Sequence, residues 1–219
     1  MKDIKNCSFI FDLDGTLIDT EKLYRKYWPM ALSDYGYFLS DERALMLRSL
    51  GRPFAPRQFK DWYGEDFDYD LVRKRRKEYV EGFIEKNGVE LRPGVKELLT
   101  FLKENKITVA IATATDLQRT KKYLAMTGID KFFDEEKIIC ATMVEHGKPA
   151  PDIYEYVLKT LNASPSDCFA VEDAPNGVKS AKAAGLNVIF VPDQSPADDS
   201  IKDLLYADFP VISDIKTLF

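Results

Sequence analysis

Short apolar segments alternate with helical segments over the second half of the chain. Each apolar segment is a continuous run rich in β-branched residues, which is typical of a parallel strand that is buried on both faces. Five segments are expected as strands: ITVAIAT (107–113), KIICAT (137–142), DCFAVE (167–172), NVIFVP (187–192) and DFPVI (208–212). This alternation predicts an α/β fold in which helices cover both faces of a parallel sheet.

A helical block separates the first strand from the rest of this sheet. The segment FIF (9–11) has the same apolar character as the later strands, so it belongs to the same sheet. Residues 21 to about 86 contain no convincing strand and are expected to be helical. The chain is therefore divided into a core segment 1–19, a helical insertion 20–88 and a second core segment 89–219. The segment 17–20 would lead into the insertion and would pair with the return crossing near 87–92.

Three of the predicted strands lead directly into polar residues. Asp12 and Asp14 follow the first strand. ITVAIAT ends in Thr113, and DCFAVE ends in Glu172, with Asp173 next to it. In an open parallel sheet, ligands bind at the carboxyl ends of the strands. These side chains are therefore expected to converge on one site.

A lysine and a hydroxyl accompany the carboxylates. Lys148 lies in HGKPAPDIY, in a loop before a helix, and is expected at the same edge of the sheet. Carboxylates that are packed together repel one another unless a cation joins them, and a set of oxygen ligands favours Mg²⁺. Lys148 as a point charge and Thr113 as a donor would suit a phosphoryl group. The set indicates phosphoryl transfer through an aspartyl phosphate.

These motifs resemble those of the haloacid dehalogenase superfamily, in its branch of phosphatases and β-phosphoglucomutases with a helical cap inserted after the first strand. Four superfamily motifs occur in order: DLDGT (12–16), Thr113, Lys148 in GKPAPD, and Glu172-Asp173 in VEDAPNG. A DxD pair alone would be weak evidence, whereas four motifs at the right strand ends are specific. The resemblance covers essentially the whole chain and implies a Rossmann-like parallel sheet core with an inserted α-helical cap domain.

The resemblance implies a role for each carboxylate. Asp12 matches the nucleophile, which attacks phosphorus and also binds Mg²⁺. Asp14 matches the general acid and base, and its backbone carbonyl would bind the metal. Asp173 would bind Mg²⁺ directly, and Glu172 would hold a metal-bound water or an outer contact. True dehalogenases lack the second aspartate, so Asp14 favours phosphoryl chemistry.

The resemblance also assigns residues that would contact the phosphoryl group. Thr113 would donate a hydrogen bond to it, with the backbone N–H of Ala114 alongside. Lys148 would neutralise both Asp12 and the phosphoryl oxygens. A substrate contact of Thr115 is left open.

The cap would close over a small substrate and supply specificity. Arg48 and Arg52, in MLRSLGRPF, fall where related proteins carry cap residues that reach the substrate, and Tyr24 would face the cleft. β-Phosphoglucomutases carry a histidine four residues beyond the DT pair, which is Asp19-Thr20 here. This chain has Tyr24 at that place, which favours water over a sugar hydroxyl as the phosphoryl acceptor.

Composition excludes several other classes of function. The net charge of −5 gives no attraction for nucleic acid or an anionic membrane, and the run RKRRK (73–77) is interpreted as a solvated helix face. No apolar run is long enough to span a bilayer, and the first residues lack the features of a signal peptide. The sole histidine, His146, is given no catalytic role. Three cysteines far apart in the sequence are expected to be buried thiols of a reducing compartment: Cys7, Cys140 and Cys168. We expect a cytoplasmic monomer.

The sequence thus predicts a Mg²⁺-dependent phosphatase that hydrolyses a small soluble phosphomonoester, with sugar phosphates among the candidates. A β-phosphoglucomutase-like phosphotransferase is the enzymatic alternative. A catalytically silent binding or regulatory protein on the same fold is the alternative from another class. A phosphonate hydrolase would need a Schiff-base lysine in the cap, for which Lys22 and Lys26 are the candidates.

Overall fold

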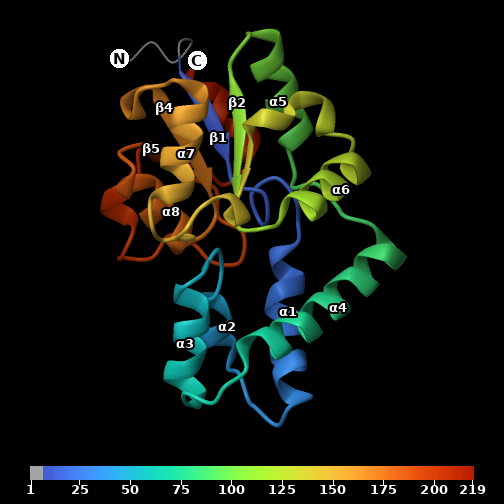
Figure 1. The fold of residues 1–219 in the computed structure, drawn as a ribbon. Coiled ribbons are helices and arrows are strands. Elements are labelled where there is room, and N and C mark those ends of the chain that lie inside the picture. The colour runs from blue at the N-terminus through green and yellow to red at the C-terminus, as the bar shows by residue number, and fades with distance from the viewer. Residues whose placement is uncertain (1–6) are drawn as a thin grey trace.

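The computed structural model describes residues 7–219 as a parallel sheet flanked by helices, with a further group of helices beyond one end of the sheet (Figure 1). Residues 1–6, with which the predicted core segment begins, lie outside the described residues. Neighbouring strands pair in parallel in the order β3–β2–β1–β4–β5–β6. The strands are β1 (Ser8–Phe11), β2 (Val109–Thr113), β3 (Ile138–Cys140), β4 (Cys168–Glu172), β5 (Asn187–Phe190) and β6 (Ala207–Asp208). The predicted α/β fold class is confirmed.

The last strand is shorter than the sequence indicated. The expected segment 208–212 contributes only Asp208 to β6, which ends before Pro210. Proline has no backbone N–H to donate to a neighbouring strand and is tolerated mainly at sheet edges. A two-residue edge strand is the consequence.

The two faces of the sheet pack against different helices. Phe9 and Phe11 point to the face covered by α5 (Val95–Glu104) and α6 (Leu117–Thr127), where the rings of Phe9 and Phe169 stack at 5.2 Å. Ile10 lies on the other face with the residues of α7 and α8. Those two helices are α7 (Asp152–Leu161) and α8 (Pro175–Ala183). This burial of both faces explains the continuous apolar runs.

The stretch 20–88, all of which the structure describes, contains helices joined by turns and loops and no strand. Its helices are α1 (Glu21–Ser33), α2 (Asp41–Met46), α3 (Phe54–Tyr63) and α4 (Tyr69–Asn87). Ser40 caps α2 by accepting a hydrogen bond from the backbone N–H of Arg43 at 3.2 Å. An aromatic cluster joins the helices, with Trp28 of α1 4.8 Å from Phe59 of α3. The exact division at residues 20 and 88 stays a prediction. We refer to helices α1–α4 and the loops between them as the cap.

The chain crosses between the sheet and the cap along two paired segments. Ile18 forms an antiparallel bridge with Leu91. The backbone N–H of Asp19 donates to the carbonyl of Glu90 at 2.9 Å. Both crossings therefore lie side by side, as the sequence predicted.

The cap lies directly against the loop that carries Lys148. The N–H of Gly51 donates to the carbonyl of Lys148 at 2.8 Å, and the N–H of Gly147 donates to the carbonyl of Arg52 at 2.6 Å. Asn176, at the start of α8, donates to the carbonyl of Arg48 at 2.8 Å. These contacts close the cap over the carboxyl ends of the strands. Within residues 7–219, no helix is both long and apolar enough to cross a membrane.

Candidate active site

The strand order brings the predicted site residues together. β1 lies between β2 and β4, so Asp12, Thr113 and Glu172 follow or end three adjacent strands at one edge of the sheet. The chain then turns at Gly15, whose φ of +85° is unfavourable for other residues. A Cβ atom at Gly15 would also overlap the carboxylate of Asp173. The motif therefore needs glycine at this place for two separate reasons.

Lys148 joins two carboxylates in the interior. Its Nζ lies 2.6 Å from Oδ1 of Asp12 and 2.6 Å from Oε1 of Glu172, and it donates to the carbonyl of Ala112 at 3.0 Å. The hydroxyl of Tyr154 donates to the same Glu172 oxygen at 2.5 Å. The two carboxylates outweigh the cost of burial and raise the pKa of Lys148, so the lysine stays charged.

Three buried carboxylates converge around this lysine. Oxygen atoms of Asp12, Glu172 and Asp173 all lie within 4.8 Å of one another. One oxygen of each has no hydrogen-bond partner among the described residues. Burial raises the pKa of Asp12 to about 8, further raised by Glu172 and Asp14 but opposed by Lys148. Burial followed by the charge of Asp12 raises the pKa of Asp173 well above its usual range.

The donor set of this cluster fits Mg²⁺. It consists of carboxylate oxygens alone, which are the ligands that hard cations prefer. A divalent cation would provide a partner for the three unpaired oxygens and would favour the ionised form of the carboxylates. The observation that supports the fit is the set of buried oxygens without partners, on Asp12, Glu172 and Asp173.

Three hydroxyl groups fix the carboxylate of Asp14. Thr20 donates to Oδ1 at 2.6 Å, Tyr24 donates to Oδ1 at 3.0 Å, and Thr115 donates to Oδ2 at 2.7 Å. Thr115, which the sequence left open, therefore contacts the acid and lines the cavity. Thr113 is fully buried, and its hydroxyl accepts a hydrogen bond from the N–H of Thr115 at 3.0 Å.

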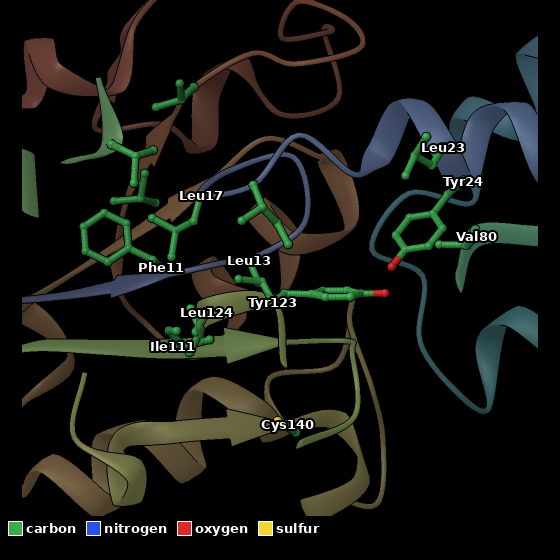
Figure 2. Packing of buried hydrophobic residues seen from close by; sticks show 14 of the residues in the cluster. Phe11, Leu13, Leu17, Leu23, Tyr24, Val80, Ile111, Tyr123, Leu124 and Cys140 are labelled. Atoms are coloured by element: carbon green, nitrogen blue, oxygen red, sulfur yellow. The ribbon is translucent and has the colours of Figure 1, made fainter. Parts of the chain in front are cut away.

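An arginine of the core connects Tyr24 to a carboxylate of the cap. Figure 2 shows the hydroxyl groups of Tyr24 and Tyr123 pointing toward one another across the junction of cap and core. Nη2 of Arg119, on α6, donates to both hydroxyls at 3.0 Å. Its Nε lies 2.7 Å from Glu81 on α4. Residues of α1, α4 and α6 thus form one network that reaches Asp14.

A cavity of about 340 Å³ lies between the cap and the strand ends. Asp12, Asp14, Ala114 and Thr115 belong to its core side. Its cap side includes Glu21, Tyr24, Arg48, Arg52, Arg73 and Arg76. The volume is within the range of pockets that enclose small molecules.

The two predicted cap arginines both line this cavity but differ in burial. Arg48 is buried, and its Nη2 donates to Ser195 at 2.7 Å. Its Nη1 has no hydrogen-bond partner among the described residues. Arg52 is half-exposed and forms an ion pair with Asp70 of the cap. Arg48 is thus the better placed of the two to contact a ligand.

Some sequence interpretations need correction. The run at 73–77 is not wholly solvated, because Arg76 is buried and both Arg73 and Arg76 line the cavity. Lys22 and Lys26 are exposed and do not line the cavity, so the phosphonate hydrolase alternative lacks its lysine. The interpretations of two other groups agree with the structure. His146 is not among the residues that line the cavity, and its Nδ1 lies 3.0 Å from Oδ2 of Asp152. The three cysteines are buried and form no disulfide.

Several residues at the site were not recognised in the sequence. Glu21 is buried beside Asp173 and Asp14, and burial followed by the charges of these carboxylates raises its pKa well above the usual range. Tyr154 and Arg119 reach the site from helices on opposite faces of the sheet, and no short motif marks either of them. The burial of Arg76 could have been predicted from the helical period. It stands four residues from Val72 and from Val80, on the buried face of α4.

Comparisons with known proteins place the chain in a family. The sequence model of the haloacid dehalogenase-like hydrolases matches residues 8–185. The "Phosphorylated carbohydrates phosphatase" of Thermotoga maritima is 32% identical over 189 residues, covering 83% of this chain and 82% of that protein.

Solved structures agree with this match. CbbY from Rhodobacter sphaeroides, in complex with phosphate, has a TM-score of 0.78 at 25% identity and covers 95% of each chain. A putative β-phosphoglucomutase from Bacteroides vulgatus has a TM-score of 0.81 at 25% identity and covers 99% of this chain and 88% of that one. The motifs, the sheet order and the family match over most of its length together show that this chain belongs to the haloacid dehalogenase-like hydrolases.

Proposed function

We propose that this hydrolase is a Mg²⁺-dependent phosphatase that cleaves small soluble phosphomonoesters, sugar phosphates among them, through an aspartyl phosphate on Asp12. The observation that carries the proposal is the state of Asp12: one oxygen is held by Lys148, and the other is buried without a partner beside Asp14 and Asp173. The chain is a phosphomonoester hydrolase, since a relative that covers most of it is named as a phosphatase.

Asp12 and Asp14 divide the chemistry between them. In the first step an oxygen of Asp12 forms a bond to phosphorus while the bond to the leaving oxygen breaks, and Asp14 gives its proton to that oxygen. In the second step Asp14 takes a proton from water, whose oxygen attacks phosphorus and releases Asp12 and inorganic phosphate. The three hydroxyls on Asp14 fix its position for both proton transfers.

The neighbouring groups hold the negative charge of the phosphoryl group. Lys148 keeps Asp12 oriented and offers its charge to the phosphoryl oxygens. Ala114 and Thr115 line the cavity at the end of β2, and the N–H of Ala114 is the proposed donor to the phosphoryl group. Thr113 supports Thr115 by accepting a hydrogen bond from its N–H. The hydroxyl of Thr113 accepts the hydrogen bond from the N–H of Thr115, so its own hydrogen remains free. Thr113 could therefore still donate a hydrogen bond to the phosphoryl group.

The cluster of carboxylates would hold Mg²⁺. Asp12, Asp173 and the backbone carbonyl of Asp14 are the proposed ligands, with Glu172 as a water-mediated or outer contact. When bound, the cation offsets the charge of the phosphoryl group and the carboxylates. Glu172 is already occupied on one oxygen by Lys148 and Tyr154, which supports an outer role.

The cap would keep water out of the site during transfer. Tyr24, Arg48 and Arg52 are the proposed substrate contacts on its side of the cavity. A closed cavity strengthens the electrostatic interactions inside it and prevents unwanted reactions of the intermediate. The paired crossings near Ile18 and Leu91 are the natural place for the opening motion that releases product.

A β-phosphoglucomutase-like phosphotransferase is the second candidate, because a putative member of that class shares this fold over nearly the whole chain. Tyr24 argues against it. Burial and the charge of Asp14 raise the pKa of Tyr24, so the phenol stays neutral and cannot accept a proton at neutral pH. Glucose 1-phosphate with a bisphosphate activator should therefore yield inorganic phosphate rather than glucose 6-phosphate.

Hydrolysis of p-nitrophenyl phosphate tests the proposal. The wild type should release p-nitrophenol with Mg²⁺ and stop when EDTA is added. Asp12→Asn should abolish turnover while leaving the fold intact, because the amide is nearly isosteric but is not a nucleophile. An inactive wild type with Mg²⁺ would favour the silent binding protein, and an active Asp12→Asn would contradict the covalent mechanism. A screen of phosphorylated metabolites would then identify the substrate.

A further inference from the structure

A buried arginine without a counter-ion lies in the cap wall of the cavity. Arg76, on α4, is 9% exposed and lies against two aromatic rings of α1. Its guanidinium carbon is 4.6 Å from the ring centre of Tyr24 and 4.6 Å from that of Trp28. Among residues 7–219 it forms no ion pair, and its buried Nε has no hydrogen-bond partner.

Three other arginines of the cavity wall form ion pairs. Arg25 pairs with Asp41, Arg52 with Asp70, and Arg119 with Glu81. Arg48 and Arg73 also line the cavity, and neither makes an ion pair in the described part of the chain. Arg48 donates to Ser195, whereas Arg73 stands one helical turn before Arg76 on α4. On α4, the wall therefore carries two positive charges that form no ion pair with a carboxylate among residues 7–219.

The carboxylates of the cavity do not compensate for these charges. Asp12 is paired with Lys148, Asp14 accepts from hydroxyl groups, and Asp116 is paired with Lys77 at 3.1 Å. Glu21 and Glu145 also line the cavity, but within residues 7–219 neither forms an ion pair with Arg73 or Arg76. A buried charge without a partner is unfavourable unless a ligand supplies the missing charge. Burial lowers the pKa of Arg76, and the nearby arginines lower it further.

The geometry leaves Arg76 available to an anion that can accept two parallel hydrogen bonds. The aromatic rings contact the guanidinium without accepting conventional hydrogen bonds from its N–H groups, and its buried Nε has no partner among the described residues. Phosphate and carboxylate groups match the edge of a guanidinium with two parallel hydrogen bonds. Because the ring of Tyr24 contacts Arg76 while its hydroxyl contacts Asp14, one tyrosine side chain separates Arg76 from the proposed acid.

We propose that Arg76, with Arg73 beside it, binds a second acidic group of the substrate, a phosphate or a carboxylate at the end of the molecule away from the cleaved ester. The inference rests on the proposed phosphatase function and narrows its substrates to phosphate esters with two acidic ends. The cavity of about 340 Å³ has room for a short polyol chain between those ends.

Calorimetric titration of the Asp12→Asn protein with Mg²⁺ tests this proposal without turnover. Three linear ligands of equal carbon length serve as probes: glucitol 6-phosphate, 6-phosphogluconate and glucitol 1,6-bisphosphate. The two probes with a second acidic group, 6-phosphogluconate and glucitol 1,6-bisphosphate, should bind about tenfold or more tightly than glucitol 6-phosphate. A hydrogen bond to a charged partner has an effect of this size. Comparison of the affinities for 6-phosphogluconate and glucitol 1,6-bisphosphate shows whether a carboxylate or a phosphate is preferred as the second acidic group.

A second substitution localises the effect. Arg76→Gln, added to the Asp12→Asn protein, should remove most of the gain in affinity, and Arg76→Lys should restore part of it. Lys74→Gln is the matched control, because Lys74 lies on the same helix, carries the same charge and is exposed. If Arg76→Gln lowers the yield of folded protein, Arg73→Gln takes its place. This variant should also reduce the gain in affinity that the second acidic group provides.

The outcomes separate this inference from the proposed function. Equal affinities for all three probes, or a gain that survives both Arg76→Gln and Arg73→Gln, would overturn the second-anion site. A wild type that releases no phosphate from any ester would overturn the phosphatase, while the titrations would still report on Arg76. The ratio of kcat/KM for 6-phosphogluconate to kcat/KM for glucitol 6-phosphate can also be compared between the wild type and Arg76→Gln. A lower ratio in Arg76→Gln supports both the second-anion site and the phosphatase function.

Discussion

Tyr24 of the cap donates a hydrogen bond of 3.0 Å to Oδ1 of Asp14 in the core. The bond forms only while the cap lies against the strand ends, because the two residues belong to different parts of the structure. Arg119 holds the same hydroxyl from the core side at 3.0 Å. The position of the proposed acid therefore depends on the position of the cap.

Tyr24→Phe should lower kcat on alkyl phosphate esters by about twofold to tenfold, the usual effect of one net hydrogen bond. Thr20 and Thr115 would still hold Asp14. Steady-state kinetics measure the effect. Tyr27→Phe is the control, since Tyr27 is buried on the same helix but does not line the cavity. An unchanged kcat in Tyr24→Phe would show that this bond does not position the acid.

Asp14→Asn should reduce kcat by about 10²-fold to 10⁴-fold on alkyl esters, the usual contribution of a general acid and base. The loss should be smaller with p-nitrophenyl phosphate, because its leaving group needs little protonation. The measurement is kcat for a series of esters with leaving groups of different acidity. Equal losses over the whole series would contradict the role of Asp14 as the acid.

Asp173→Ala should raise the Mg²⁺ concentration needed for half-maximal activity by at least about tenfold, because a proposed ligand is lost. The fold should persist, since within residues 7–219 the side chain of Asp173 accepts a single weak hydrogen bond, from Thr16 at 3.3 Å. Mg²⁺ titration of the activity measures the shift. Ca²⁺ should replace Mg²⁺ poorly, because its coordination is larger and looser. Full activity after thorough chelation would refute the metal assignment.

The stability of the metal-free protein should depend on Asp12 with a defined sign. Its pKa rises from an ordinary 3.8 to about 8 on folding. A carboxyl with a raised pKa contributes stability that is complete below its unfolded pKa and is lost as the pH rises through the folded pKa. In EDTA, the melting temperature of the wild type should therefore fall relative to that of Asp12→Asn between about pH 5 and pH 8.

Added Mg²⁺ supplies the second arm of that experiment. The cation favours the ionised carboxylates, so it should stabilise the wild type more at the upper end of this range than at the lower end. A difference between wild type and Asp12→Asn that stays constant over the range would mean that Asp12 keeps an ordinary pKa.

Gly51→Ala should disturb closure of the cap and lower kcat/KM by about tenfold to a hundredfold. A Cβ atom at Gly51 would lie 2.6 Å from Cα of Gly147, so one of the two backbone segments would have to move. Gly82→Ala is the matched control, because a Cβ there meets no atom within 4 Å. Similar kinetics for both variants would show that the contact between Gly51 and Gly147 is dispensable.

Residues at strand ends could be predicted because topology alone determines their meeting place. Once the parallel sheet was inferred, Asp12, Glu172 and Asp173 had to approach one another, and the structure brings them within 4.8 Å. Lys148 was identified from a motif whose loop lies beside them. No knowledge of side-chain packing was needed for either inference.

Residues on helices were harder, because their contribution depends on how each helix is rotated and docked. Arg119 and Tyr154 reach the site only through the packing of α6 and α7 on the sheet. For Arg76 the helical period was visible, since it falls between Val72 and Val80 on the buried face. The surrounding basic residues hid this signal, because a run of charges is usually solvated.

The paired crossings at Ile18 and Leu91 have a consequence for evolution and engineering. The Cα atoms of paired antiparallel residues are only about 4.5–5.5 Å apart. The cap therefore begins and ends at nearly the same point of the core. Any folded segment whose own ends meet can occupy that point without lengthening the sheet or moving Asp12. Recognition can therefore diversify by exchange of whole modules while the inherited chemistry stays constant, and a chimaera joined at residues 18 and 91 would carry the preferences of the donor.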